Sequence, residues 1–110
     1  SKEQLKSKNR TYVVYQLNCD FCNVVIPEIL NHLSETEKDT VIFVNAQSEA
    51  GKEITKQYGV EHASTVVEIE NGKEKAQYQL AFYRNDKVEL NHDNLNRFYN
   101  RVSDLMQQRS

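Results

Sequence analysis

This sequence has few of the residues that mark specialised classes of protein. Its 110 residues contain no Trp, one Met, one Pro, three Gly and two Cys. So little Gly and Pro excludes a collagen-like repeat and a Pro-rich linker, because both need a large share of these residues. Two cysteines are too few for a small domain held together by several disulfides. The chain is therefore expected to fold around a hydrophobic core.

Long apolar runs and concentrated charge are also missing. No apolar run approaches the roughly 20 residues that a membrane-spanning helix needs. The formal net charge is −2, and the 14 Lys and Arg residues are scattered along the chain. Nucleic-acid binding depends on a basic surface that neutralises phosphates. We therefore expect neither a membrane span nor a nucleic-acid partner.

The chain starts with a polar segment, residues 1–10, and has no initiator Met. Such a start is what a protein retains after a signal peptide or membrane anchor is removed. We therefore expect a location outside the cytoplasm, by secretion or by anchoring. The remaining residues, 11–108, have the length of one domain with its own core.

Hydrophobic patterning predicts alternating strands and helices in the first half of the chain. Residues 11–17 and 41–44 are rich in β-branched and aromatic side chains, which predicts two buried strands. Between them, apolar residues at three- and four-residue spacing predict a helix over 21–33, which Pro27 should kink. A second, weakly patterned helix is expected over 48–58, with Ser48 as its N-cap and Gly59 ending it.

The second half of the chain predicts a hairpin and a final helix. Residues 65–69 form a third strand, and Asn71-Gly72 is a strong hairpin-turn signal. The return strand should lie within 75–83, followed by a turn at 84–87 and a short strand at 88–90. Asp93 is the expected cap of the last helix. The order β-α-β-α-β-β-α indicates an α/β fold with a mixed central sheet flanked by helices.

Both cysteines belong to one C-x-x-C motif, Cys19 to Cys22, between the first strand and the first helix. The free N–H groups and dipole at a helix N-terminus stabilise a thiolate, which is the nucleophile of disulfide exchange. Cys19 should therefore be the exposed attacking thiol, and Cys22, one turn further on, the resolving thiol. A disulfide across so small a loop restricts the unfolded chain little, so stability is a weak reason for the pair.

Three other readings of the motif compete with redox chemistry. The cysteines could be half of a zinc site, an inert structural pair, or two core residues without a function. Structural zinc takes four ligands, and the chain has no second Cys pair and only isolated His residues, His32, His62 and His92. A C-x-x-C within a β-α-β pattern favours redox chemistry.

The chain resembles the thioredoxin family over about 11–106. The C-x-x-C ends the first strand, and Pro27 matches the proline of the family's first helix. The segments 58–60 and 64–67 resemble the family's Tyr-Gly-Val/Ile and Pro-Thr region, and Asn71-Gly72 matches its next turn. The resemblance implies a monomeric thiol–disulfide oxidoreductase without an organic cofactor. It would act on protein thiols and disulfides together with an electron donor or acceptor protein, and the backbone of Ala63, Ser64 and Thr65 would position the substrate.

Several positions depart from the family. Ser64 stands in place of the family's cis-proline, so we expect a trans peptide before it. Val13 replaces the buried acid and Asn18 replaces the Trp before the motif. The loss of the proline, with His62 nearby, also leaves open a metal-binding or iron–sulfur variant. These departures resemble the divergent extracytoplasmic thioredoxin-like proteins of Gram-positive bacteria, including bacteriocin transport accessory proteins.

Other residues modify these expectations. Asp20 and Phe21 lie inside the motif, and the charge of Asp20 should oppose a second anion on Cys19 and favour reductase behaviour. The aromatic residues of 78–83 alternate at strand spacing, which predicts sheet packing. The stretch 75–91 exceeds what a minimal thioredoxin needs, so it is a longer hairpin or a partner-binding extension. Two alternative functions stay open: a binding or chaperone module without catalysis, and a redox sensor.

Overall fold

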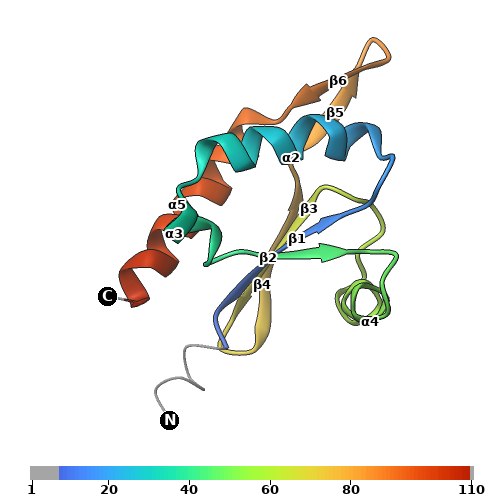
Figure 1. Cartoon of the computed structure of the whole chain (residues 1–110). Helices are drawn as coiled ribbons and strands as arrows, with labels where there is room; N and C mark the ends of the chain where they lie inside the picture. The colour runs from blue at the N-terminus through green and yellow to red at the C-terminus, as the bar shows by residue number, and fades with distance from the viewer. Residues whose placement is uncertain (1–7, 110) are drawn as a thin grey trace.

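Residues 8–109 are described by the computed structural model, shown in Figure 1. Of the polar segment expected over residues 1–10, residues 1–7 lie outside the described part of the chain. In chain order the elements are β1 (Arg10–Tyr15), α2 (Asp20–His32), α3 (Glu35–Lys38), β2 (Ile42–Asn45), α4 (Glu49–Tyr58), β3 (Thr65–Glu70), β4 (Lys73–Gln79), β5 (Ala81–Arg84), β6 (Lys87–Leu90) and α5 (His92–Arg109).

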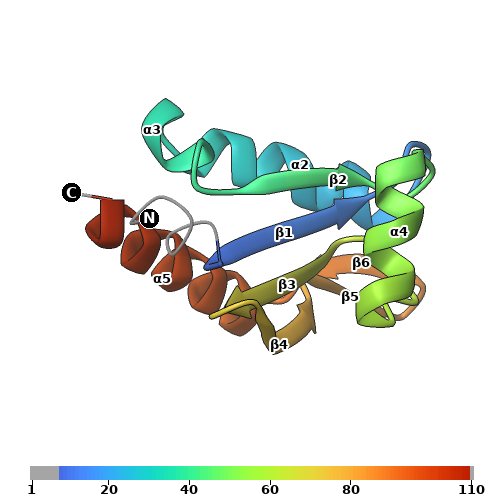
Figure 2. The same cartoon turned by 90° about the horizontal axis from the view of Figure 1, so that it is seen from below.

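The central sheet has the strand order β2-β1-β3-β4, which Figure 2 shows from below. β1 runs parallel to β2, with Val13 opposite Phe43, and antiparallel to β3, with Val13 opposite Val66. The β1-α2-β2 connection therefore joins parallel strands, while β3 and β4 form a hairpin. The predicted mixed α/β sheet is confirmed. The Asn71-Gly72 turn is confirmed too, because both residues have the positive φ that this turn needs.

Helices cover both faces of the sheet and close two separate cores. α2 and α5 pack on one face and α4 on the other, as Figure 1 shows. Val13, Val25 and Phe98 belong to the first core and are fully buried. Tyr12, Val14 and Val67 belong to the second core, beside α4. Successive residues of β1 thus point to opposite faces, so this strand is anchored from both sides.

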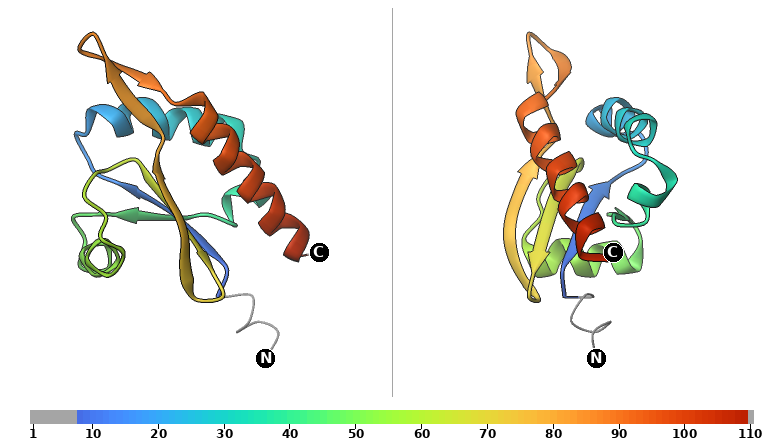
Figure 3. Two further views of the ribbon diagram at one scale, coloured as in Figure 1. Left: turned by 180° about the vertical axis from the view of Figure 1, so that it is seen from behind. Right: turned by 90° about the vertical axis from the view of Figure 1, so that its left-hand side faces the viewer.

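The predicted return strand is present as β4, but it starts at Lys73, before the predicted 75–83, and does not extend to Tyr83. β4 ends at Gln79, and β5 pairs with β6 in a separate two-stranded sheet. The change of partner falls at Leu80, whose side chain is fully buried. Its N–H donates to the carbonyl of Ser64 (3.1 Å) and continues the β3–β4 pairing by one residue. Its carbonyl accepts from the amide of Asn91 (2.8 Å) and continues the β5–β6 pairing. The β5–β6 hairpin then projects past the sheet beside α2, as Figure 3 shows.

Both predicted ends of α4 are confirmed, whereas the predicted cap of α5 is wrong and the helix α3 was not predicted. Ser48 caps α4 by accepting from the Gly51 amide (2.9 Å), and Gly59 ends it at φ +64°. The cap of α5 is Asn91 rather than Asp93, because the Asn91 side chain accepts from the Asn94 amide (3.0 Å) and Asp93 already lies in the helix. The short helix α3 was not predicted; a capping box between Ser34 and Glu37 starts it.

α5 is fixed to the sheet by a buried cation. Arg101 is only 4% exposed, and its guanidinium donates to Thr11 Oγ1 (3.0 Å) and to the Ile69 carbonyl (2.8 Å). It also pairs with Glu70 at 3.6 Å. These bonds satisfy a charge that would otherwise be costly to bury. Among residues 8–109, no helix has the length and apolar content needed to cross a membrane.

Candidate active site

Cys19 is held at the N-cap position of α2. β1 ends at Tyr15, and the chain turns through Leu17 and Asn18, which has φ +58°. Asn tolerates this left-handed conformation better than most residues. Cys19 then returns to an extended conformation (φ −103°, ψ 124°), and Asp20 begins the helix. A side chain at this position faces the free N–H groups of the first helical turn.

The sulfur of Cys19 acts as the helix cap. Its Sγ accepts from the backbone amide of Cys22 at 3.2 Å. A thiolate accepts such a bond more strongly than a thiol, because charge-assisted bonds are about twice as strong as neutral ones. Both cysteines are free thiols, Cys19 being partly exposed and Cys22 buried. The structure thus gives the two thiols the unequal exposure that the sequence predicted.

Cys22 is held as a protonated thiol. It is 4% exposed, and its pKa is raised from 9.0 to about 11. Burial is the largest cause and the hydrogen bond with Cys19 acts in the same direction, while the backbone amides of Gln16 and Ser64 partly lower the pKa. The Gln16 amide donates to Cys22 Sγ at 3.5 Å. Val13 occupies the position of the family's buried acid in the fully buried core.

Ser64, which the sequence resemblance places where thioredoxins have a cis-proline, has a positive φ. No cis peptide occurs among residues 8–109, so the expected trans bond before Ser64 is confirmed. Ser64 adopts φ +58°, which is strained for a residue with a Cβ atom. It is fully buried, its amide donates to the Val14 carbonyl (2.7 Å), and its Oγ has no hydrogen-bond partner within the described residues.

A groove of about 490 Å³ opens beside Cys19. One side is formed by residues 19–21 at the start of α2, and the other by 61–63 in the loop before β3. Gln16, Gln79 and Tyr83 complete the lining. Of the three predicted substrate-positioning residues only Ala63 reaches the groove, since Ser64 and Thr65 are buried beneath it. No backbone hydrogen bond within the described residues engages Ala63.

Tyr83, on the β5–β6 hairpin, also belongs to the site, and the sequence analysis did not predict this role. Its hydroxyl donates to Asp20 Oδ2 (3.3 Å), and its ring packs on Phe21 with centroids 4.8 Å apart. Desolvation and the neighbouring Asp20 charge raise the pKa of Tyr83. Strand alternation had assigned these aromatics to sheet packing, yet Tyr83 is 58% exposed. The length of 75–91 predicted a longer hairpin or a partner-binding extension, but no sequence signal pointed to a contact with Asp20 or Phe21.

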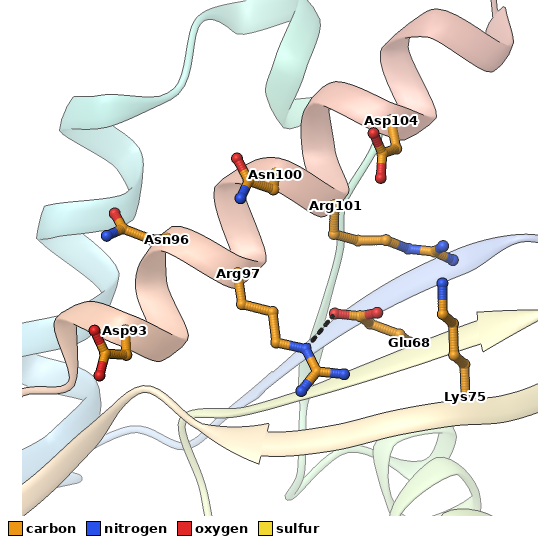
Figure 4. A pocket seen from close by; sticks show the side chains of 8 residues that line it. All are labelled: Glu68, Lys75, Asp93, Asn96, Arg97, Asn100, Arg101 and Asp104. Carbon is orange, nitrogen blue, oxygen red and sulfur yellow. Dashed lines mark ion pairs between the residues drawn. The ribbon is translucent and has the colours of Figure 1, made fainter.

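A second pocket, between α5 and the sheet, has the character of a structural polar network. Figure 4 shows Arg97 reaching from α5 to Glu68 on β3, with Nε and Oε2 3.8 Å apart. Glu68 is 3% exposed and also accepts from the Tyr78 hydroxyl. Glu68 is not among the groups that shift the pKa of Cys22, which are Cys19, Gln16 and Ser64. Its charge is matched within the pocket.

Metal-ligating side chains do not gather at the site. Within residues 8–109, no group of three or more His, Cys, Asp or Glu residues is placed to hold a metal ion. His62 lines the groove, while His32 stacks on Tyr99 with ring centroids 3.7 Å apart.

A mixed sheet, helices on both faces and a C-x-x-C pair at the N-terminus of α2 define a thioredoxin fold. No protein-family model matches the sequence, and a search of curated proteins finds no match. Solved structures do match. Thioredoxin f2 from Chlamydomonas reinhardtii is 22% identical, with a TM-score of 0.58 over 89% of this chain and 84% of that chain.

Two further structures agree. Trxlp from Edwardsiella tarda is 21% identical, with a TM-score of 0.54 over 70% of this chain and 77% of that chain. Thioredoxin from Fasciola hepatica is 22% identical, with a TM-score of 0.52 over 70% and 72% of the two chains. The chain therefore has the thioredoxin-like fold that the sequence predicted.

Proposed function

We propose that this protein is a thiol–disulfide oxidoreductase that acts on protein substrates through Cys19 and Cys22. One observation carries the proposal: Cys19 lines an open groove at a helix N-terminus, while Cys22 is buried. The backbone amide of Cys22 donates a hydrogen bond to the sulfur of Cys19. This arrangement separates an attacking thiol from a resolving thiol.

In the reductive direction the reaction has two exchanges. The Cys19 thiolate attacks one sulfur of a substrate disulfide, forms a mixed disulfide, and releases the other substrate sulfur as a thiolate. Cys22 then loses its proton and attacks the Cys19 sulfur, which releases the second substrate sulfur and leaves a Cys19–Cys22 disulfide. Two electrons pass to the substrate. An electron donor protein would return the pair to the reduced state.

The second exchange is expected to be the slower one. Cys22 must lose its proton to become a nucleophile, and its pKa of about 11 leaves little thiolate near neutral pH. Val13 offers no carboxylate to accept this proton. The amides of Gln16 and Ser64 favour the charged sulfur and partly offset the effect of burial. The mixed disulfide should therefore persist longer than in a protein with a buried acid.

An extended substrate segment would lie along the groove next to Ala63. The N–H and carbonyl of Ala63 have no backbone partner within the described residues, so both are available to a substrate strand. Such pairing gives affinity without sequence specificity. Ser64, buried beneath, would hold Ala63 in place through its bonds to Val14 and Leu80.

Insulin reduction tests the proposal. With dithiothreitol as the electron donor, the wild-type protein should accelerate precipitation of the insulin B chain, and Cys19→Ser should not. Equal rates with the wild type, with Cys19→Ser and with dithiothreitol alone would contradict the proposal. That outcome would favour a binding module that keeps the fold without the chemistry.

We also propose that the protein works outside the cytoplasm, as the extracytoplasmic thioredoxin-like proteins of Gram-positive bacteria do. The departures at Val13, Asn18 and Ser64 motivate this assignment. Fractionation of the native cells, with an antibody to this domain, should find the protein in the extracytoplasmic fraction. Recovery in the cytoplasm alone would contradict it.

A further inference from the structure

The groove beside Cys19 is acidic. Asp20 and Glu61 are the charged residues among the nine that line it, and no Lys or Arg lines it. Both side chains are exposed, and they come from two elements, the first turn of α2 and the loop before β3. A thiolate on Cys19 adds a third negative charge. The positive end of α2 offsets only about half of one charge.

Neither carboxylate forms an ion pair within the described residues. The ion pairs there involve other acids, namely Glu35, Glu68, Glu70 and Glu89. The partner of Asp20 is the neutral hydroxyl of Tyr83, at 3.3 Å. An unpaired acidic rim with a reactive thiolate between its sides favours a cationic occupant.

Elsewhere in the molecule, an arginine binds a tyrosine–carboxylate pair like the one formed by Tyr83 and Asp20. At the second pocket the Tyr78 hydroxyl donates to Glu68, and Arg97 pairs with Glu68 while lying 4.8 Å from the Tyr78 ring centroid. At the groove the Tyr83 hydroxyl likewise donates to the Asp20 carboxylate, and Tyr83 is 58% exposed. The tyrosine and the carboxylate are present there, but no arginine of the described residues joins them.

We propose that the groove selects substrate segments that carry Lys or Arg beside the reacting cysteine. The substrate cation would pair with Asp20 or Glu61 and lie against the Tyr83 ring, as Arg97 does at Tyr78. At Asp20, cation–π attraction to Tyr83 and the carboxylate would act on the same group. This inference rests on the proposed thiol–disulfide exchange and names its substrate class.

Matched peptides test the preference. Three peptides with one central Cys are made as mixed disulfides with 2-mercaptoethanol, with the Cys flanked on both sides by Lys, by Ser or by Glu. Reduced protein is mixed with each, and its oxidation is followed by mass spectrometry under single-turnover conditions. Reaction of the same peptides with dithiothreitol gives their intrinsic reactivity, by which each protein rate is divided.

The normalised rate should fall in the order Lys, Ser, Glu. At low salt the normalised rate of the Lys peptide should exceed that of the Glu peptide by roughly fivefold or more. The ratio is modest because each exposed ion pair contributes at most about 1 kcal/mol, which corresponds to about fivefold in rate. High salt should reduce this ratio towards one, since the charges are screened. Glu61→Lys should bring the Lys-to-Glu ratio close to one, because the new cation opposes the remaining negative charges of Asp20 and the Cys19 thiolate.

A matched control variant shows whether the preference depends on charge at the groove or on the net charge of the protein. Glu74→Gln removes one exposed acid on β4, where Glu74 pairs with Ile69, whereas Gln79 at the groove pairs with Thr65. The two positions are five residues apart on the strand, roughly 17 Å. Glu61→Gln should lower the Lys-to-Glu ratio and Glu74→Gln should leave it unchanged.

The two levels of the proposal fail in different ways. Equal normalised rates for the three peptides, with wild type faster than Cys19→Ser, would overturn the substrate preference and leave the oxidoreductase function intact. A preference that Glu74→Gln lowers as much as Glu61→Gln does would also overturn it. No protein-dependent reaction with any peptide, together with inactivity on insulin, would overturn the oxidoreductase function itself.

Discussion

The backbone amide of Cys22 donates to the sulfur of Cys19 at 3.2 Å. The attacking sulfur thus serves as the cap of the helix that carries the resolving thiol. Because the cap bond favours a charged sulfur, the local structure of α2 and the reactivity of Cys19 have the same origin. Burial has the opposite effect on Cys22 and keeps it protonated.

The raised pKa of Cys22 predicts a loss of stability at alkaline pH. In the unfolded chain this thiol loses its proton near its ordinary pKa of 9.0, whereas the folded protein keeps it until about pH 11. The contribution is therefore fully present below pH 9 and is lost as pH rises to about 11. The loss should be on the order of 2 kcal/mol.

Urea unfolding of the reduced protein at several pH values measures this effect. Cys22→Ser is the control, because the titrating groups outside the Cys19–Cys22 pair are shared and cancel in the comparison. The wild-type free energy of unfolding should fall more steeply above pH 9 than that of Cys22→Ser. Parallel profiles for the two proteins would show that Cys22 is not held as a thiol by the fold.

Ser64 is predicted to reject proline, although proline is what the family has there. Its φ is +58° and its amide donates to Val14 at 2.7 Å, whereas proline fixes φ near −65° and has no N–H. Ser64→Pro should cost roughly 3 kcal/mol or more. Ser64→Gly should gain about 1 kcal/mol, because it relieves the strained φ and removes a buried hydroxyl without a partner.

Denaturant unfolding of these variants gives the test. Ser64→Ala, which keeps the strained φ and loses only the hydroxyl, should fall between the wild type and Ser64→Gly. A Ser64→Pro variant as stable as the wild type would mean that this loop readily takes another conformation, and the described geometry of the groove would then be wrong.

Much of the fold could be predicted from the sequence, because its signals are local. Strand composition, the Ser48 and Gly59 caps and the Asn71-Gly72 turn each act over a few residues, and all are confirmed. The C-x-x-C motif likewise gave the positions of both thiols relative to α2. Its place between the first strand and the first helix predicted that Cys19 lies at the helix N-terminus, and its spacing predicted that Cys22 lies one turn inside.

The groove could not be predicted because it depends on distant contacts. Tyr83 reaches Asp20 across 63 residues, and its hairpin follows the change of strand partner at Leu80. Strand alternation describes Tyr83 equally well as a packing residue. Glu61 carries no motif at all, and its role follows from the placement of the loop before β3.

Asp20 should make the disulfide less oxidising. Asp20 follows Cys19 in the sequence, and both groups act on the Tyr83 hydroxyl, so the charge of Asp20 should destabilise a reduced form in which Cys19 is a thiolate. Asp20→Asn should raise the reduction potential by about 5–20 mV, since exposed charge pairs contribute up to about 1 kcal/mol. Equilibration with glutathione buffers measures the potential, and Glu74→Gln is the matched control. A fall in potential, or an equal change in the control, would contradict the argument.

The most direct test of the account is to trap the mixed disulfide with insulin. Cys22→Ser removes the resolving thiol, so the reaction should stop after the first exchange. Mass spectrometry under non-reducing conditions should find Cys22→Ser joined covalently to insulin through Cys19, while Cys19→Ser accumulates no such adduct. Adducts that form equally in both variants, or through Cys22 alone, would contradict the assignment of Cys19 as the attacking thiol.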